Sequence, residues 1–547
     1  MTIVDLLEMN ARAYNDEVAL VEINPEEKEV KRLSWMEADL VEPNPMHSYR
    51  REITWGVFDE KANRFANMLI QRGIKKGDKV AILLMNCIEW LPIYFGVLKA
   101  GALAVPLNFR YAADEIEYCV NLAEADVLVF GPSFVDRVQS IVDSIAPNRM
   151  LFYVGENCPS YAESYNELTA NCSSQAPRVR LDQKDNAAIY FSSGTTGFPK
   201  AILHNHESLV HSARVEQNHH GQTKDDVFLC IPPLYHTGAK MHWFGSLLAG
   251  SKAVLLKGTK PELILKAASK EKCTIVWLLV PWAQDILEAI DSGAVNLEDY
   301  DLSKWRLMHI GAQPVPPSLI KHWKEYFPNH SYDTNYGLSE SIGPGCVHLG
   351  VENIDKVGAI GKAGFGWETK IVDENRKTVT KGEVGELAVK GPGVMTCYYN
   401  DPKATAEVMD DKGWLYTGDM AMEDEDGFIF LVDRKKDVII SGGENIYPVQ
   451  IENFLRAGLD AIHDVAVIGV PDARLGETTL AVIELKEGMS LTEDEVNEYA
   501  KNLPRYKRPH QIVFADIPRN PTGKIEKPKL RKIYCGDVNL VEAQNRG

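Results

Sequence analysis

Apolar and polar positions along the first third of the chain follow two alternating periods. Apolar residues recur at spacings of four, three and four, at Phe58, Ala62, Phe65 and Leu69. This spacing predicts one apolar face of a helix. Thr54 is a residue type that caps a helix start, and Gly73 is a type that ends one. We therefore expect a helix between these two residues.

Short continuous apolar stretches separate the helical patterns. They predict buried strands over residues 79–84, 103–106 and 127–130, with helices over residues 89–100 and 113–123 between them. Helices that alternate with buried strands are typical of crossover units, which build mostly parallel sheets covered by helices on both faces. The predicted fold class is therefore α/β, with a large N-terminal domain that contains several sheets.

The pattern changes near residue 433, where a charged stretch at 433–437 follows an apparent hairpin strand at 427–432. The elements expected beyond it are a helix from Pro448, strands near 465–470 and 479–485, and a helix from Glu493. Such a set suits a small α+β domain of common size. We therefore predict two domains, at residues 1–433 and 434–547.

Composition and charge exclude several classes of protein. Hydrophobic residues make up 45% and charged residues 25% of the 547 residues, which excludes a disordered or collagen-like chain. Lys and Arg total 59 against 77 Asp and Glu, and the net charge of -18 argues against nonspecific binding to nucleic acid or anionic lipid. The most apolar region, 81–107, contains Asn86, Glu89 and Lys99, so we expect no membrane span.

Two further features concern location. Residues 1–22 lack the basic start and the unbroken apolar stretch of a signal peptide. The nine cysteines are scattered and form no CxxC pair, which argues against a disulfide framework and against a zinc–thiolate site. We therefore expect a cytoplasmic protein.

Residues 190–200 form a loop rich in glycine and hydroxyl groups after an apolar stretch. Glycines let backbone N–H groups converge on an anion, hydroxyls add donors, and Lys200 adds positive charge. The loop is not a Walker A loop, because Gly194 and Gly197 are too close and Ala201 follows the lysine. On composition alone, a phosphate loop and a simple polar turn fit equally well.

The same residues 190–200 closely resemble the phosphate loop of the AMP-forming adenylating superfamily of acyl-CoA synthetases, nonribosomal adenylation domains and luciferases. Five further stretches resemble motifs of that family, in its order: the adenine-contacting turn 311–314, the YGxTE motif 336–340 with Ser339 for threonine, the ribose motif 416–419, the hinge 433–437 and the C-terminal lysine motif 520–524. The resemblance covers most of the chain. It implies a carboxylic acid:CoA ligase in which residues 1–433 bind ATP and acid and residues 434–547 form a mobile domain.

The resemblance implies which residues contact ATP. They are Ser192, Ser193, Gly194, Thr195, Thr196, Gly197, Lys200, Gly311, Ala312, Gln313, Tyr336, Gly337, Ser339, Asp419 and Arg434. Asp419 suits the ribose hydroxyls, because an ionised carboxylate accepts two hydrogen bonds. Outside the ordered motifs, Asp419 is better explained as a turn residue.

Three catalytic residues follow from the same resemblance, and each has a simpler alternative. Glu340, together with Thr196, is expected to hold Mg²⁺ at the phosphates, although it also fits a solvated helix start. Lys524 is expected between the carboxylate and the α-phosphate, although it also fits a surface lysine. His236 is expected beside the acid, although it also fits a buried structural histidine.

The resemblance also implies use of coenzyme A. It assigns Lys436 to the hinge, and Ser441, Gly442, Gly443 and Glu444 to the pantetheine tunnel. No carrier-protein domain follows Lys524, so we expect a stand-alone ligase. Loading of a carrier protein, oxygen chemistry of the luciferase type, a non-catalytic nucleotide-binding regulator and a homodimeric assembly stay open.

The acid itself is only broadly predicted. Residues 234–243 contain no Asp or Glu to pair with a substrate ammonium, which favours a simple carboxylic acid. Trp243 and Leu279 are expected to line the acyl pocket, and the bulky indole predicts limited depth. We expect a short- or medium-chain, alicyclic or aromatic acid rather than a long-chain fatty acid.

The histidines suggest a competing function. They include His204, His206, His211, His219 and His220. No Asp, Glu or Cys stands at a recognised metal-binding spacing from them. A metal-hydrolase interpretation is therefore disfavoured.

Overall fold

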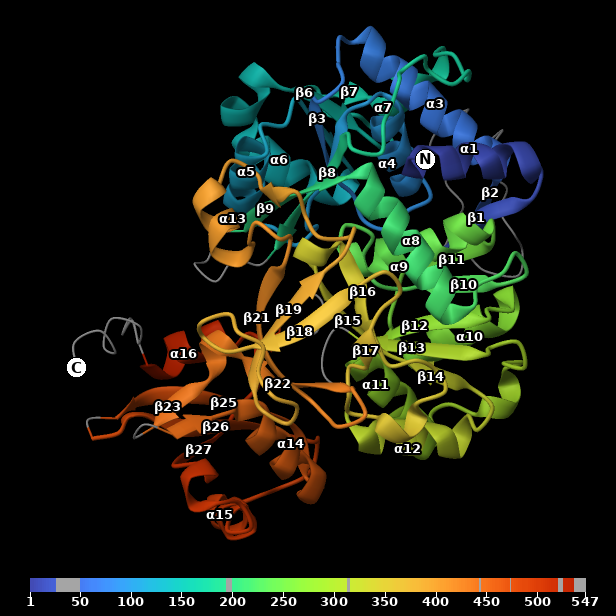
Figure 1. Ribbon diagram of the computed structural model, residues 1–547. Coiled ribbons are helices and arrows are strands. Elements are labelled where there is room, and N and C mark those ends of the chain that lie inside the picture. Colours follow the sequence, from blue (N-terminus) through green and yellow to red (C-terminus); the bar gives the residue numbers. More distant parts are fainter. Residues whose placement is uncertain are drawn as a thin grey trace.

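The computed structural model describes residues 1–25, 50–192, 199–311, 315–441, 444–472, 474–519 and 525–535 (Figure 1). The chain folds as mixed α/β, with a large N-terminal part and a small C-terminal domain, which confirms the predicted fold class.

The first sheet of the large domain has eight strands in the order β20-β9-β8-β4-β3-β5-β6-β7. They are β3 (Lys79–Leu83), β4 (Leu103–Pro106), β5 (Val127–Phe130), β6 (Met150–Tyr153), β7 (Glu163–Ser164), β8 (Asn186–Ser192), β9 (Lys200–Asn205) and β20 (Cys397–Tyr398). The associated helices are α3 (Trp55–Gln71), α4 (Trp90–Lys99), α5 (Ala113–Leu122), η1 (Pro132–Phe134), α6 (Val135–Ile145), η2 (Ala146–Asn148) and α7 (Tyr165–Ala170). Pairing is parallel from β8 to β7 and antiparallel from β8 through β9 to β20.

Helix α3 shows why the local prediction works here. The Thr54 hydroxyl accepts a hydrogen bond from the Val57 N–H at 3.2 Å, which satisfies one of the free donors at the helix start. The four predicted apolar positions are fully buried. The helix ends at Gln71, and Gly73 follows with φ of 91°, a conformation that suits glycine.

The second sheet has seven strands in the order β14-β13-β12-β10-β11-β1-β2. All neighbouring strands are parallel except the pair of β1 with β2, which is antiparallel. They are β1 (Val18–Ile23), β2 (Arg50–Thr54), β10 (Val227–Cys230), β11 (Lys252–Leu256), β12 (Ile275–Leu279), β13 (Leu307–Gly311) and β14 (Ser331–Asp333). The helices of this part are α1 (Ile3–Ala13), α8 (His206–His220), α9 (Thr237–Ala249), α10 (Pro261–Glu271), α11 (Val280–Asp291), η3 (Leu297–Asp299) and α12 (Pro317–Tyr326). One hydrophobic core joins α8 and α9 to strands of both sheets.

Two antiparallel sheets follow along the chain. The smaller contains β15 (Asn335–Leu338), β16 (Gly343–His348) and β17 (Lys362–Ala363), and the larger contains β18 (Glu368–Val372), β19 (Gly385–Lys390), β21 (Leu415–Glu423) and β22 (Ile429–Arg434). The connecting helices are η4 (Ser339–Ser341), η5 (Ile354–Lys356) and α13 (Pro402–Val408). Pairing in both sheets is antiparallel, unlike the mostly parallel pairing that the sequence predicts for the large domain. Antiparallel neighbours need no crossover helix, so short connections can join them.

The C-terminal domain has its own sheet, in the order β24-β23-β26-β25 with β27 beside β26. Its elements are η6 (Lys435–Asp437), β23 (Ile439–Ser441), β24 (Glu444–Ile446), α14 (Pro448–Gly458), β25 (Ile462–Asp472), β26 (Gly476–Leu485), α15 (Glu493–Ala500), η7 (Arg505–Lys507), β27 (Gln511–Phe514) and α16 (Lys527–Cys535). Apolar side chains of α14 and α15 cover one face of the sheet, and α16 covers the other. The predicted boundary at residues 433 and 434 falls at the end of β22 and stays a prediction.

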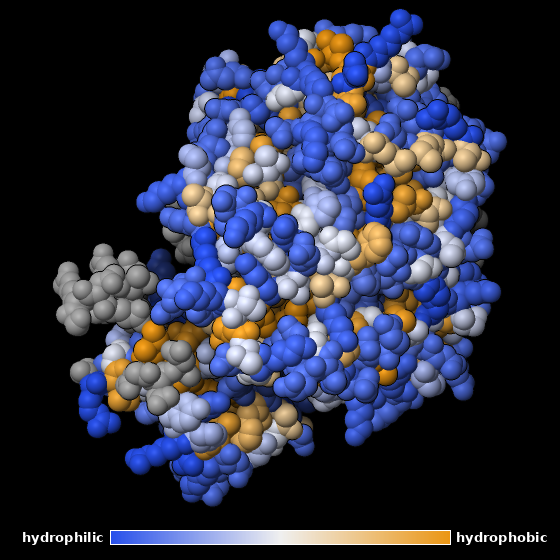
Figure 2. Space-filling model, viewed as in Figure 1, coloured by the Kyte–Doolittle hydropathy of each residue, from blue (hydrophilic) through white to orange (hydrophobic). Residues whose placement is uncertain are grey.

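The molecular surface is mostly hydrophilic. Figure 2 shows apolar side chains scattered among polar ones over one face, as is normal for a globular protein. Within the described ranges, no helix has both the length and the apolar character needed to cross a bilayer.

Candidate active site

The hairpin of β8 and β9 fixes both ends of the predicted phosphate loop. Ser192 and Lys200 are paired across these antiparallel strands. The chain therefore leaves and re-enters the sheet at the same point. Ser193, Gly194, Thr195, Thr196 and Gly197 lie outside the described residues.

A carboxylate, a tyrosine and a lysine meet next to this hairpin. The Tyr398 hydroxyl donates a hydrogen bond to Glu340 Oε1 at 2.9 Å. Lys200 Nζ lies 4.7 Å from the centroid of the Tyr398 ring. Burial raises the pKa of Glu340, and the hydrogen bond from Tyr398 and the charge of Lys200 act in the opposite direction. Glu340 is therefore a partly enclosed carboxylate with a nearby cation, rather than a fully solvated helix start.

The short helix η4, which carries Ser339 and Glu340, is held in place by hydrogen bonds. His204 Nε2 donates to the Ser339 carbonyl oxygen at 2.8 Å, and the Met395 N–H donates to the Glu340 carbonyl oxygen at 2.7 Å. Burial lowers the pKa of His204 to about 4, so the ring is neutral at pH 7 and its Nε2 carries the single hydrogen. These contacts fix the backbone of the turn that carries Glu340.

Three of the residues assigned to the nucleotide lie together. The Tyr336 hydroxyl donates a hydrogen bond to Asp419 Oδ2. Arg434 Nε lies 3.5 Å from Asp419 Oδ1, and the two residues are paired across β21 and β22. Asp419 is only 8% exposed, so it is held rather than free in a turn.

Gly311 of the adenine motif and Gly337 of the YGxTE motif both lie in strands. Gly311 ends β13 and Gly337 lies within β15. A Cβ atom at Gly311 would lie 3.9 Å from the Asn335 carbonyl oxygen, so β13 ends next to the start of β15. Ala312 and Gln313 lie outside the described residues.

His236 caps α9. Its Nδ1 accepts a hydrogen bond from the Gly238 N–H at 3.1 Å, so Nδ1 carries no hydrogen and the neutral ring holds its proton on Nε2. Leu279 is buried at the end of β12. Both residues stay predicted to contact the acid.

Trp243 is fully buried in a cluster of aromatic rings. Its centroid lies 6.0 Å from that of Phe58, 5.9 Å from that of Phe95 and 5.7 Å from that of Phe244. Within the described residues, its neighbours therefore come from α3 and α4 as well as from α9. A role for Trp243 in limiting the acyl pocket stays a prediction.

The predicted hinge follows the last strand of the large domain. Lys436 lies in η6, and burial together with the charge of Arg434 lowers its pKa. Ser441 ends β23 and is paired with Gly476 of β26. Gly442, Gly443 and Lys524 lie outside the described residues, as does the side chain of Glu444.

Burial also affects the carboxylate that precedes the hinge. Asp433 is 7% exposed, and burial raises its pKa to about 6, although Lys527 acts to lower it. Its Oδ2 accepts a hydrogen bond from the Val449 N–H at 3.0 Å, which joins the end of β22 to the start of α14. The hinge is therefore bordered by a carboxylate that is easily protonated.

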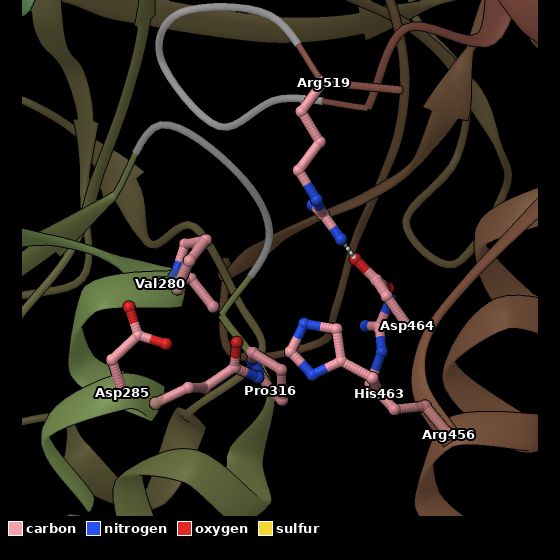
Figure 3. A pocket seen from close by; sticks show the side chains of 9 residues that line it. Val280, Asp285, Pro316, Arg456, His463, Asp464 and Arg519 are labelled. Atoms are coloured by element: carbon pink, nitrogen blue, oxygen red, sulfur yellow. Dashed lines mark hydrogen bonds and ion pairs between the residues drawn. The ribbon is translucent and has the colours of Figure 1, made fainter. Parts of the chain in front are cut away.

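A small cleft lies between the large domain and the small one (Figure 3). It is lined by Val280, Pro281, Gln284, Asp285 and Pro316 from the large domain, and by Arg456, His463, Asp464 and Arg519 from the small domain. Arg456 and Arg519 both form ion pairs with Asp464. Arg519 directly precedes the lysine motif in the sequence, and Val280 directly follows Leu279.

Tyr398 and the residues that line the cleft were not among the site residues predicted from the sequence. Tyr398 touches Glu340, which is 58 positions away, and Lys200, which lies much earlier in the chain. No periodic pattern marks such a contact, because only the pairing of β20 with β9 brings Tyr398 there. The only feature of the sequence that marks this position is the pair of adjacent tyrosines at 398 and 399.

Comparison with known proteins agrees with this arrangement. The pattern of the AMP-binding enzyme family matches residues 8–399, and that of the AMP-binding enzyme C-terminal domain matches residues 450–524. The chain belongs to the AMP-binding enzyme family.

Its relatives share one class of reaction. The long-chain-fatty-acid–CoA ligase FadD13 of Mycobacterium tuberculosis is 32% identical over 492 residues, which cover 89% of this chain and 94% of that protein. Feruloyl-CoA synthase of an Amycolatopsis species is 32% identical over 486 residues, covering 88% of this chain and 94% of that protein. Within its family the chain is therefore an enzyme of the acid–CoA ligase class.

A solved structure supports the same fold over the whole chain. The anthranilate CoA ligase AuaEII in complex with anthranoyl-AMP superposes with a TM-score of 0.84 at 26% identity, covering 98% of this chain and 97% of that one. ATP-bound MatB from Rhodopseudomonas palustris gives the same TM-score and identity, covering 98% of this chain and 100% of that one.

Proposed function

We propose that the protein is an AMP-forming carboxylic acid:CoA ligase. In the first half-reaction, a carboxylate oxygen attacks the α-phosphorus of ATP, and pyrophosphate leaves. In the second, the sulfur of coenzyme A attacks the acyl carbonyl and AMP leaves. The observation that carries the proposal is the meeting of Glu340, Tyr398 and Lys200 beside the phosphate-loop hairpin, in a chain whose relatives are CoA ligases.

The first half-reaction brings anions together and needs positive charge. Glu340 supplies a carboxylate oxygen of the type that Mg²⁺ prefers, and Thr196 is the proposed second contact. When bound, the metal ion neutralises charge on the phosphates. Lys200 adds a cation, and Lys524 is proposed to place its ammonium at the carboxylate and the α-phosphate. The Asp419 carboxylate is proposed to accept hydrogen bonds from the ribose hydroxyls.

The second half-reaction is proposed to use the small domain. Its loop of Ser441, Gly442, Gly443 and Glu444 would admit the pantetheine arm, and rotation at Lys436 would exchange this loop with Lys524. The separate core of the small domain supports this proposal, because a unit with its own core can move as a rigid body about a few hinge residues.

For the acid, we propose a short- or medium-chain, alicyclic or aromatic substrate. The full burial of Trp243 supports a pocket of limited depth. The relatives act on acids of several of these kinds, since their names include a medium-chain fatty-acid–CoA ligase of Escherichia coli and a 4-coumarate–CoA ligase of Narcissus pseudonarcissus.

A panel of carboxylic acids tests the function. Pyrophosphate release from ATP should depend on the acid, and acyl-CoA should appear only when coenzyme A is added. Glu340→Gln should lose activity at limiting Mg²⁺, whereas Glu368→Gln on the exposed edge of β18 should match the wild type. Release of pyrophosphate without thioester formation, for every accepted acid, would contradict a CoA ligase.

A further inference from the structure

A second polar cluster is buried in the large domain, away from Glu340. It contains Glu216 and His220 of α8, His242 of α9, His309 of β13, Asp333 of β14 and His348 of β16. None of these residues is more than 3% exposed. The proposed ligase reaction uses none of them, so the cluster requires a separate explanation.

Three atoms of this cluster face one another. His220 Nε2 lies 3.1 Å from His309 Nδ1 and 3.1 Å from Asp333 Oδ2, and His309 Nδ1 lies 3.9 Å from Asp333 Oδ2. Zinc binds nitrogen and oxygen at about 2.0–2.2 Å in a tetrahedron, which sets its ligand atoms about 3.3 Å apart. The three donor atoms are therefore spaced as ligands of one ion would be.

Hydrogen bonds alone do not satisfy the cluster. His220 Nε2 carries at most one hydrogen, yet it faces both a ring nitrogen of His309 and a carboxylate oxygen of Asp333. Within this cluster, four buried atoms have no hydrogen-bond partner in the described part of the chain, namely Glu216 Oε2, His220 Nδ1, His309 Nε2 and His348 Nε2. Unsatisfied polar atoms are rare in protein interiors, so hydrogen bonds within the protein leave this cluster incompletely satisfied.

The surroundings of the three atoms resemble the outer shell of a metal site. His220 Nδ1 lies 3.3 Å from Glu216 Oε2, so the ring has a carboxylate on the side opposite the facing donors. The Gly350 N–H donates to Asp333 Oδ1 at 2.9 Å, and His348 Nδ1 lies 3.1 Å from Asp333 Oδ2. Carboxylate and backbone partners of this kind fix the orientation of metal-binding side chains.

Charge favours a divalent cation. Among the described residues, the ion-pair partners of Glu216 and Asp333 are all histidines. Metal binding requires neutral imidazoles. In that state the two buried carboxylates carry two negative charges, and buried charges need compensation. One divalent ion balances them.

We propose that His220, His309 and Asp333 bind a divalent transition metal of the zinc type. The imidazole and carboxylate donors suit zinc, iron, cobalt or nickel better than Mg²⁺. The ion would tie α8 to the adjacent strands β13 and β14. Because β13 ends at Gly311, two residues after His309, the metal would fix the strand end that leads into the predicted nucleotide site. This site is distinct from the proposed Mg²⁺ site at Glu340 and does not depend on the ligase reaction.

Metal binding can be measured without the reaction. Wild-type protein is stripped with a chelator and titrated with Zn²⁺ in the presence of excess Mg²⁺, and bound zinc is counted by elemental analysis. We expect one zinc per chain and a higher melting temperature with zinc. His309→Gln should weaken zinc binding about tenfold or more and abolish the melting shift. Glu340→Gln should bind zinc as the wild type does.

His330→Gln is the matched control, because His330 is also a buried histidine but lies against Trp305 and outside the cluster. If His309→Gln does not fold, the visible absorption of Co²⁺ bound to wild-type protein, and its displacement by Zn²⁺, decides the question. Zinc well below one equivalent with no Co²⁺ absorption, or equal binding by folded His309→Gln, would overturn the proposal.

Discussion

Helix α9 borders two buried polar regions that treat charge in opposite ways. His242 of this helix faces the histidine–carboxylate cluster, where Glu216 Oε2 is 3.5 Å from His242 Nε2. Lys240, two positions earlier, is fully buried among the rings of Trp90, Tyr94 and Tyr190. Within the described residues, no carboxylate pairs with Lys240. In the histidine–carboxylate cluster, each charged group has a partner of opposite charge. Around Lys240 the charge itself is disfavoured, because burial lowers the pKa of Lys240 well below 10.5.

The difference shows that burial alone does not decide the state of an ionisable group. Asp333 is fully buried, yet the neighbouring His348 and His220 help to hold its pKa well below its usual range against the effect of burial. Lys240 has only the Leu234 carbonyl oxygen, at 3.4 Å, as a hydrogen-bond acceptor. The partners within hydrogen-bond reach therefore decide whether a buried group keeps its charge.

The largest expected effect comes from removing the charge of the cluster. Asp333→Asn leaves His220 and His348 without their carboxylate partner in a dry interior. Breaking a buried pair from one side costs about 3–5 kcal/mol in the free energy of unfolding. Urea denaturation in the presence of a chelator measures this loss without a contribution from metal. Asp299→Asn, at an exposed position, should change stability by less than about 0.5 kcal/mol.

The opposite result is expected for Lys240. Lys240→Met replaces a buried amine that has no carboxylate partner and should stabilise the fold by about 1–3 kcal/mol at pH 7. Lys99→Met should destabilise it, because Lys99 is equally buried but pairs with Glu8 and Asp59 at 2.9 and 2.8 Å. Similar losses of unfolding free energy in both variants would contradict this expectation. They would show that the charged form of Lys240 makes stabilising contacts.

The pH dependence of Lys240 follows from its lowered pKa. Unfolded chains bind a proton at this lysine up to about pH 10.5, whereas the folded state releases it at lower pH. The stability of the wild type should therefore rise as pH increases between the folded pKa and 10.5. Lys240→Met should lack this rise in urea denaturation series at several pH values.

Asp433 in the predicted hinge is a third case, because burial raises the pKa of its carboxyl group. Its pKa of about 6 is above the ordinary value of 3.8, so the folded state binds more protons between these pH values. Its contribution to stability is fully present below pH 3.8 and is lost as pH rises through 6. Asp433→Asn should remove a pH-dependent contribution of about 2 kcal/mol, measured by urea denaturation between pH 4 and 7. The exposed Asp426→Asn should leave the pH profile unchanged.

The smallest expected effect concerns Glu340, whose carboxylate is held by Tyr398. Tyr398→Phe removes a hydrogen bond that lowers the Glu340 pKa, so the acidic limb of adenylation should move to higher pH. We expect about a tenfold slower rate of acid-dependent pyrophosphate release, equivalent to about 1.4 kcal/mol. The neighbouring Tyr399→Phe, whose hydroxyl contacts Glu124 and Lys79 rather than Glu340, is the control. An unshifted limb would mean that Glu340 does not set the pH dependence.

Local patterns predicted the elements that depend on neighbouring residues. The start of α3 follows from the hydroxyl of Thr54, and β4 spans residues 103–106 as expected, because strand period and caps act over a few positions. The structure pairs Ser192 with Lys200 and Asp419 with Arg434, and the roles of these residues in nucleotide binding stay predictions.

Contacts between distant residues could not be predicted in this way. His220 and Asp333 are 113 positions apart, and only the order of β13 and β14 beside α8 brings them within 3.1 Å. Trp243 stands next to a family motif, but its ring packs on Phe58 and Phe95, which come from helices at the other end of the core. Such contacts depend on the packing of whole sheets, which no single stretch of sequence encodes.

The two-sided cover of the C-terminal sheet also has a consequence for evolution. With α14 and α15 on one face and α16 on the other, the apolar positions of β25 and β26 are buried inside the small domain itself. Changes in the large domain that alter the acid pocket therefore do not disturb this core. A chain built in this way can diversify its choice of acid while inheriting the small domain as an unchanged unit.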